Sequence, residues 1–220
     1  WAVGEKVTQL LADYKIPTPQ FQDAEIPNYE KRDPAPRFQL PLSPEESMKL
    51  VQLPVEFEME LFASEPMINK PINLAFDARG RLWVTSNTEY PFPAAKERWA
   101  DAQGSRVQDS KDAIKILEDT NGDGRADKVT DFVDGLNVPI GVLPYGNGCI
   151  AWSIPNIWYF EDTDGDDVAD KRSIVFGPLG YEKDVHGNCS SFRLGPDGWI
   201  YLLTDAPEGR ILRLAPTIAR

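Results

Sequence analysis

The feature that most constrains the fold is an internal repeat after residue 55. Residues 69–73 (Asn-Lys-Pro-Ile-Asn) recur as 137–141 (Asn-Val-Pro-Ile-Gly), and Gly80 and Gly148 follow at the same distance. A third copy of the glycine turn lies at 195–202 (Gly-Pro-Asp-Gly-Trp-Ile-Tyr-Leu). A period of about 40 to 50 residues with about four strands per unit is typical of β-propeller blades. Three hairpins that share only turn chemistry are the alternative, and the fixed spacing argues against it.

Each unit is predicted to hold four strands. The first strand precedes the glycine turn, the second follows it, the third enters an acidic loop and the fourth leaves that loop. The predicted ranges are 72–77, 81–86, 113–118 and 128–133, then 140–145, 149–153, 157–161 and 171–176, then 190–195 and 199–203, with an insertion at 87–111. The fold class is therefore all-β, with about three four-stranded blades. Because a closed propeller needs at least four, the sequence predicts part of a ring.

The region before the repeat differs in composition and is predicted to be a separate arm over residues 1–54, with the partial propeller over 55–220. A short apolar periodicity at 3–14 favours one small amphipathic helix. Ser43-Pro44-Glu45-Glu46 is a capping box with proline at the first helical position, which predicts a helix over 44–50. The proline-rich segment 15–42 between them is expected to be extended and to cover part of an open propeller surface.

Two nine-residue acidic loops end the third strand of the first two units. The first runs from Asp119 to Asp127 and the second from Asp162 to Asp170. Calcium prefers six to eight oxygen ligands, and these loops place oxygens at positions 1, 3, 5, 7 and 9. The candidate ligands are Asp119, Asn121, Asp123, Arg125 (carbonyl) and Asp127, and Asp162, Asp164, Asp166, Val168 (carbonyl) and Asp170.

The loops differ at position 6, where a sharp turn favours glycine. Gly124 meets this need in the first loop, whereas Asp167 stands there in the second, and aspartate tolerates a left-handed backbone better than most residues. Position 12 is Thr130 or Ser173 and not the glutamate of an EF-hand, so calcium-clipped hairpins are predicted. The alternative is a pair of solvated acidic turns without metal.

Charge and cysteine content narrow the classes of partner. A formal net charge of −12 disfavours nucleic acid and anionic membrane surfaces, whose phosphates would be repelled. No apolar run has the roughly 18 residues of a membrane span. Cys149 and Cys189 form no haem motif, and they are either a disulfide pair or two isolated thiols. The first residue is Trp1, which predicts either a removed signal peptide or a longer chain.

The connections at the end of the blades opposite the acidic loops are the candidate site. His186 is the one histidine of the chain, and its unperturbed pKa lies near neutrality. It stands beside Asp184 before an innermost strand, where it is either a general base or a hydrogen-bonded structural residue. The other residues of this candidate substrate or partner face are Lys70, Asn73, Asn137, Asn156, Asn188 and Asp205, with Glu89 and Tyr90 of the insertion at its rim.

Three runs carry a family resemblance: residues 70–84, residues 114–128 and Ser153-Ile-Pro-Asn-Ile-Trp158. Over about 43–203 the chain resembles the N-terminal propeller domain of a membrane-bound dehydrogenase family of planctomycetes and Verrucomicrobia. That family consists of secreted or periplasmic proteins and is distantly similar to soluble quinoprotein (PQQ) sugar dehydrogenases, which are six-bladed. The resemblance implies a secreted or periplasmic location and part of a six-bladed ring.

The quinoprotein similarity extends to His186 followed by residues 192–201 (Phe-Arg-Leu-Gly-Pro-Asp-Gly-Trp-Ile-Tyr). In those enzymes a histidine before such a strand is the general base, so the resemblance implies this role for His186, although its spacing from the turn is one residue longer. The resemblance also implies PQQ as cofactor, but the half of the ring that binds PQQ in those enzymes lies outside this chain. The cofactor-binding residues stay unknown. No haem motif is present.

Two functions follow. The first is a calcium-stabilised propeller of an exported PQQ-type sugar or alcohol dehydrogenase-like protein. The alternative is a non-catalytic scaffold that binds a glycan or a protein. In either case a second copy or another chain is expected to complete the propeller, and carbohydrate is the expected small partner.

Overall fold

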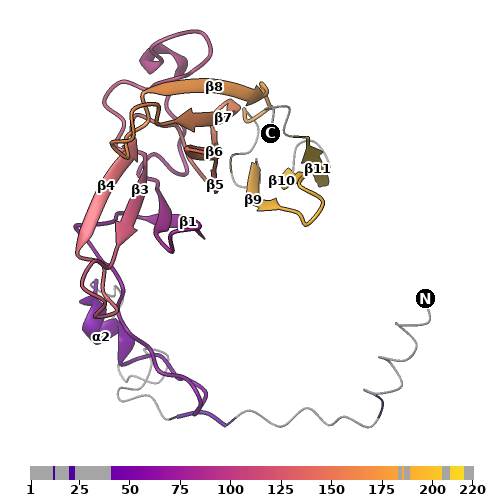
Figure 1. Ribbon diagram of the computed structural model, residues 1–220. Coiled ribbons are helices and arrows are strands. Elements are labelled where there is room, and N and C mark those ends of the chain that lie inside the picture. The colour runs from indigo at the N-terminus through magenta and orange to yellow at the C-terminus, as the bar shows by residue number, and fades with distance from the viewer. Residues whose placement is uncertain are drawn as a thin grey trace. The chain divides into compact units, whose positions relative to one another are not determined.

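The computed structural model describes residues 12, 20–22, 41–182, 185, 189–204 and 209–215. The chain divides into two compact units, Trp1–Leu61 and Phe62–Arg220, which are treated separately (Figure 1). Within the described part, none of the helices has both the length and the apolar character that a membrane crossing requires.

The first unit contains the short helix α2 (Pro44–Met48) at the predicted capping box. The Ser43 hydroxyl accepts a hydrogen bond from the Glu46 amide at 3.1 Å, and the Glu46 carboxylate accepts one from the Ser43 amide at 3.2 Å. These reciprocal bonds satisfy two amides that a helix start leaves without partners. The helix predicted at 3–14 and most of the segment 15–42 lie outside the described residues.

The second unit consists of three antiparallel sheets, so the all-β prediction is confirmed. The first sheet contains β1 (Pro71–Phe76), β2 (Leu82–Ser86), β3 (Ala113–Glu118) and β4 (Lys128–Val133). The second contains β5 (Val142–Tyr145), β6 (Gly148–Ser153), β7 (Asn156–Glu161) and β8 (Lys171–Phe176). The third contains β9 (Cys189–Leu194), β10 (Ile200–Thr204) and β11 (Arg210–Leu214). In each sheet consecutive strands are neighbours, and the described strands form no closed sheet.

The tight turns follow from glycine chemistry. Tyr145 pairs with Gly148 across a two-residue turn whose Gly146 has a φ of 60°, a conformation that side chains disfavour. At Gly148 a Cβ atom would lie 1.9 Å from the Phe160 carbonyl oxygen on the neighbouring strand. Gly146 is therefore needed for the turn, and Gly148, the glycine that recurs in the sequence, for the close approach of β6 and β7.

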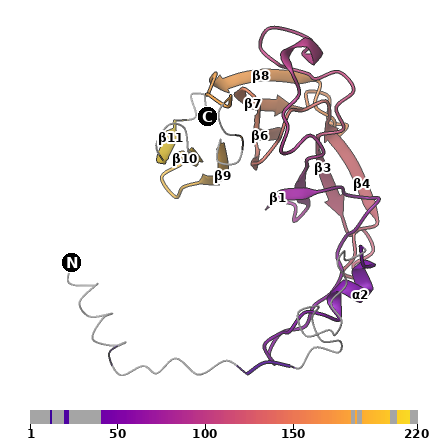
Figure 2. The same ribbon diagram turned by 180° about the vertical axis from the view of Figure 1, so that it is seen from behind.

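Two apolar clusters join the three sheets face to face. In the first cluster, Trp83 and Phe132 of the first sheet pack with Trp158 and Phe160 of the second. The rings of Trp83 and Phe132 meet edge to face, with centroids 4.6 Å apart. The second cluster is formed between the second and third sheets, and its largest members are Trp152 and Phe192. β5 consequently lies beside both β1 and β9 (Figure 1). The view from behind shows the first and third sheets on opposite sides of the second (Figure 2).

The two cysteines belong to different clusters and are both free thiols. Cys149 packs in the first cluster and Cys189 in the second, so the alternative of isolated thiols is the one formed. Burial raises the pKa of both thiols, and that of Cys189 reaches about 12. Because the thiolate is the reactive form, neither sulfur is suited to nucleophilic chemistry.

A buried carboxylate anchors the insertion between β2 and β3. Asp112 accepts hydrogen bonds from the Thr88 amide and hydroxyl and the Glu89 amide, at 2.6 to 3.0 Å. Its other oxygen accepts the Val138 amide at 2.9 Å, which ties the insertion to the entry of the second sheet. Burial raises the pKa of Asp112 although these hydrogen bonds act in the opposite direction.

We expect Asp112→Ala to lower the free energy of unfolding by on the order of 3 kcal/mol, because several buried donors lose their acceptor. Urea titration followed by tryptophan fluorescence measures this loss. The control is Asp131→Ala, which removes an exposed ion pair with Lys115 and should cost about 1 kcal/mol or less. Equal losses in the two variants would contradict the anchoring role.

Candidate functional site

The first acidic loop closes the β3–β4 hairpin and is organised by its own first and last residues. Asp119 accepts hydrogen bonds from the amides of Gly122 at 2.6 Å and Gly124 at 2.9 Å. Asp127 accepts from the Thr120 amide at 3.0 Å and the Thr120 hydroxyl at 2.8 Å. The amide of Gly124 is the main reason that the pKa of Asp119 lies below its ordinary value.

The second loop repeats this arrangement on the β7–β8 hairpin. Asp162 accepts the amides of Gly165 at 2.6 Å and Asp167 at 3.0 Å. Asp170 accepts the amide and hydroxyl of Thr163, and both bonds fall on the same carboxylate oxygen. The nine-residue spacing found in the sequence therefore has the same structural form in both loops.

Three carboxylates meet in the second loop. Oxygen atoms of Asp162, Asp164 and Asp166 all lie within 4.8 Å of one another. The negative charge of Asp166 raises the pKa of Asp164. Several hard oxygen donors around one point fit a calcium-class cation, which would relieve this repulsion. In the first loop the corresponding contact is less repulsive, because the Asn121 amide nitrogen donates a hydrogen bond to Asp123 at 3.2 Å.

The residues of the predicted substrate or partner face are mostly engaged in the fold. Asn137 is fully buried; its side-chain oxygen accepts the Ala94 amide at 2.9 Å. Asn156 is also buried and donates to the Gln103 carbonyl at 2.9 Å. The side-chain oxygen of Asn73 accepts the Val142 amide at 3.3 Å, which joins the first two sheets. Lys70 is exposed, with a φ of 41°.

The remaining members of that face, His186, Asn188 and Asp205, lie outside the described residues, as does Asp184. The three described amide side chains thus hold backbone groups of neighbouring segments. Contact of this face with a substrate or partner stays a prediction.

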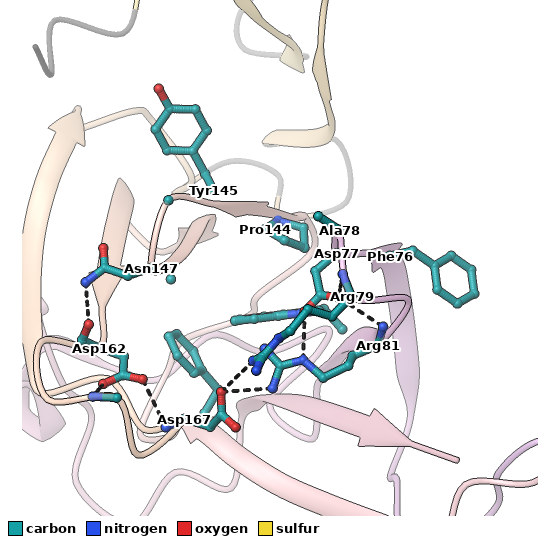
Figure 3. Close-up of a pocket in the computed structure, with 15 residues that line it drawn as sticks. Phe76, Asp77, Ala78, Arg79, Arg81, Pro144, Tyr145, Asn147, Asp162 and Asp167 are labelled. Carbon is teal, nitrogen blue, oxygen red and sulfur yellow. Dashed lines mark hydrogen bonds and ion pairs between the residues drawn. The ribbon is translucent and has the colours of Figure 1, made fainter. Parts of the chain in front are cut away.

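A hollow of about 460 Å³ lies beside the second acidic loop, where the sequence did not indicate a site. Figure 3 shows its walls, which come from the β1–β2 turn, the β5–β6 turn and the loop 162–170. The β1–β2 turn is far from the other two segments in the sequence and meets them because the first two sheets stack. Phe76, Tyr145 and Asn147 stand at its margins.

The polar centre of the hollow is a network around Asp77. One oxygen of Asp77 accepts the amides of Arg79 at 2.9 Å and Arg81 at 3.0 Å. The other accepts the Arg81 Nε at 2.8 Å and the Trp83 indole nitrogen at 3.0 Å. Burial alone would raise the pKa of Asp77, but these bonds outweigh it, and the pKa lies below its ordinary value of 3.8.

The second acidic loop completes this network through Asp167. Its carboxylate lies 2.8 Å from Arg81 Nη1 and 3.0 Å from Arg79 Nη2 (Figure 3). Arg81 is 9% exposed, and its guanidinium lies over the Trp83 ring at 5.9 Å. Two arginines are thus neutralised by Asp77 and Asp167. The hollow therefore lacks the uncompensated positive charge that a tricarboxylate quinone such as PQQ requires.

The sequence profile of a domain of unknown function, DUF7133, matches residues 43–217, which is well over half of the chain. The chain belongs to the DUF7133 family. No curated protein and no solved structure matches it. In this DUF7133 domain both acidic loops and the hollow fall within the matched range.

The Asp77 network predicts an acid-sensitive fold. Because the pKa of Asp77 is lower in the folded domain than in the unfolded chain, its contribution to stability is complete above pH 3.8 and is lost as the pH falls through the folded value. The difference in unfolding free energy between the native DUF7133 domain and Asp77→Asn should therefore be constant near neutrality and shrink below about pH 4. Urea titrations at several pH values measure it, and a difference that stays constant down to pH 2 would contradict this role.

Proposed function

We propose that this DUF7133 domain is a calcium-stabilised β-propeller segment whose described part has a scaffold role. The observation that carries the proposal is the convergence of Asp162, Asp164 and Asp166 in a loop tied at both ends by its own side chains. Within the described part of the chain no Lys or Arg pairs with Asp164 or Asp166. A bound cation is the natural partner for such uncompensated charge.

The expected ligand sets are those of the sequence analysis, with one refinement. The bonds from Thr163 use a single oxygen of Asp170, so the other oxygen is available to a cation. In the first loop Thr120 occupies both oxygens of Asp127, which suits a closing role for this residue. The second loop therefore has one more carboxylate oxygen free of threonine, whereas the sequence predicts tighter binding in the first loop, where Gly124 permits the sharp turn.

A propeller arrangement is supported by the way the sheets follow one another. Each is a meander in sequence order, and β5 lies beside β1 and β9. In a propeller these would be the innermost strands of successive blades. The face of β1 that points away from the second sheet presents Ile72, Leu74 and Phe76, each about half exposed or more. A further blade, from a second copy or another chain, would cover this apolar row.

The calcium proposal predicts two bound ions with dissociation constants on the order of 10⁻⁶ to 10⁻³ M. At a hundredfold excess over its dissociation constant each ion stabilises the fold by about 2.7 kcal/mol. Isothermal titration calorimetry should give two sites for the native chain and one for the double variant Asp164→Asn, Asp166→Asn. Asp131→Asn, at an exposed position of β4, is the control and should retain both. An unchanged melting temperature on chelation would overturn the proposal.

A quinoprotein-type dehydrogenase of an exported protein is the second candidate, favoured by the run 192–201 after His186 in the sequence. PQQ would supply the hydride-accepting quinone, and His186 would take the proton from the substrate hydroxyl. The described hollow does not fit PQQ, so any such site must involve other residues or another chain. The scaffold alternative, in which a glycan or protein is bound without chemistry, needs no such site.

We expect His186→Asn to separate these two functions. If the chain is catalytic, dye-linked oxidation of sugars with added PQQ should fall by about 10² to 10⁴ in rate while the melting temperature is unchanged. If the native chain, with calcium and PQQ present and any completing partner added, oxidises no sugar or alcohol, the dehydrogenase role is excluded and the scaffold role stands.

A further inference from the structure

The two acidic loops differ at one informative position. Position 6 is Gly124 in the first loop, with a φ of 86°, and Asp167 in the second, with a φ of 65°. A left-handed backbone costs a non-glycine residue about 1 to 2 kcal/mol. The cost is smaller for aspartate than for most residues, and a side-chain interaction that glycine cannot make can offset it.

That interaction crosses from one sheet to the next. The Asp167 carboxylate contacts Arg81 at 2.8 Å and Arg79 at 3.0 Å, both in the β1–β2 turn of the first sheet. The side chain of Asp167 is 28% exposed and that of Arg81 10%. The pair is therefore more shielded from water than an ordinary surface ion pair, which strengthens it.

A backbone hydrogen bond also joins the second acidic loop to the first sheet. The Ala169 amide donates to the Phe132 carbonyl of β4 at 2.7 Å, and Ala169 packs against the first apolar cluster. The first loop makes the equivalent contact from Ala126, whose amide donates to the Phe62 carbonyl at 2.9 Å. Each acidic loop is thus docked on the segment or sheet that precedes it in the chain.

Within the second loop, Asp167 is tied to the carboxylates that would hold the cation. Its amide donates to Asp162 at 3.0 Å, while its side chain reaches the two arginines. Asp162 is one of the three converging carboxylates. The position of the Asp167 backbone therefore depends on the loop carboxylates, whereas its side chain contacts the β1–β2 turn.

We propose that Asp167 makes the second acidic loop a cation-dependent clamp between the first and second sheets. The cation dependence rests on the calcium binding proposed above. A cation held by the loop fixes Asp162, and with it the Asp167 backbone, in the position from which the carboxylate reaches Arg79 and Arg81. Since Asp77, Arg81, Asp162 and Asp167 all line the hollow, the clamp also sets the shape of that hollow. The first loop, with glycine at position 6, holds a cation without this side-chain link.

The clamp is tested by hydrogen exchange of backbone amides with and without calcium, in the native chain and in two variants. Asp167→Gly gives the second loop the residue that the first loop has, and Asp167→Asn keeps the left-handed preference without the charge. Both variants should bind calcium, and amides of the loop 162–170 should exchange more slowly with calcium in all three proteins. Amides of the turn 77–81 should slow by about 5-fold or more with calcium in the native chain only.

The outcomes separate the clamp from the calcium proposal. If calcium protects the loop in all three proteins and the turn equally in all three, the clamp is overturned and calcium binding stands. If calcium protects neither loop nor turn in the native chain, calcium binding and the cation-dependent clamp both fail. Gly124→Asp in the first loop is the matched control: an aspartate there should give the turn 77–81 no added protection.

Discussion

Burial of the inner faces of the first two sheets against each other is the constraint from which the other features follow. Trp83 and Phe132 on one side and Trp158 and Phe160 on the other form one continuous cluster. Because an antiparallel sheet alternates its side chains, this packing fixes the direction of every second residue in β2, β3, β6 and β7. It also brings the β1–β2 turn, the β5–β6 turn and the second acidic loop to one end of the stack, where the hollow is formed.

Charge is organised around that stack in two different ways. At the Asp77 network, carboxylates and guanidinium groups balance each other, and partial burial strengthens each contact. In the acidic loops, the carboxylates other than Asp167 gather around uncharged donors, which are backbone amides, the Thr120 and Thr163 hydroxyls and the Asn121 side-chain amide. With a net charge of −12, such clusters increase the repulsion within the fold unless cations occupy them. Asp167 belongs to both systems and is the residue through which a change in one can reach the other.

The local features could be predicted because short-range chemistry determines them. The Ser43–Glu46 capping box, the glycine turns and the nine-residue loops each depend on residues close together in the chain, and each forms where it was predicted. The strand ranges followed from alternating apolar residues between turn residues. The role of Asn137 and Asn156 was harder to predict, because an asparagine at a strand connection can hydrogen-bond a ligand or a neighbouring backbone group equally well. Here both amides bond to the backbone of the insertion.

The sequence by itself determined the all-β class, the meander order of the strands and the form of the acidic loops. Periodicity, turn residues and ligand spacing act over a few residues and need no partner from elsewhere. Only the tertiary structure decided that Asp167 pairs with Arg79 and Arg81, more than eighty residues away in the chain. It also decided that Cys149 and Cys189 lie in separate clusters and that a hollow opens beside the second loop. These contacts depend on how one sheet stacks on the next, and that stacking is set by the summed burial of many side chains, which no short motif encodes.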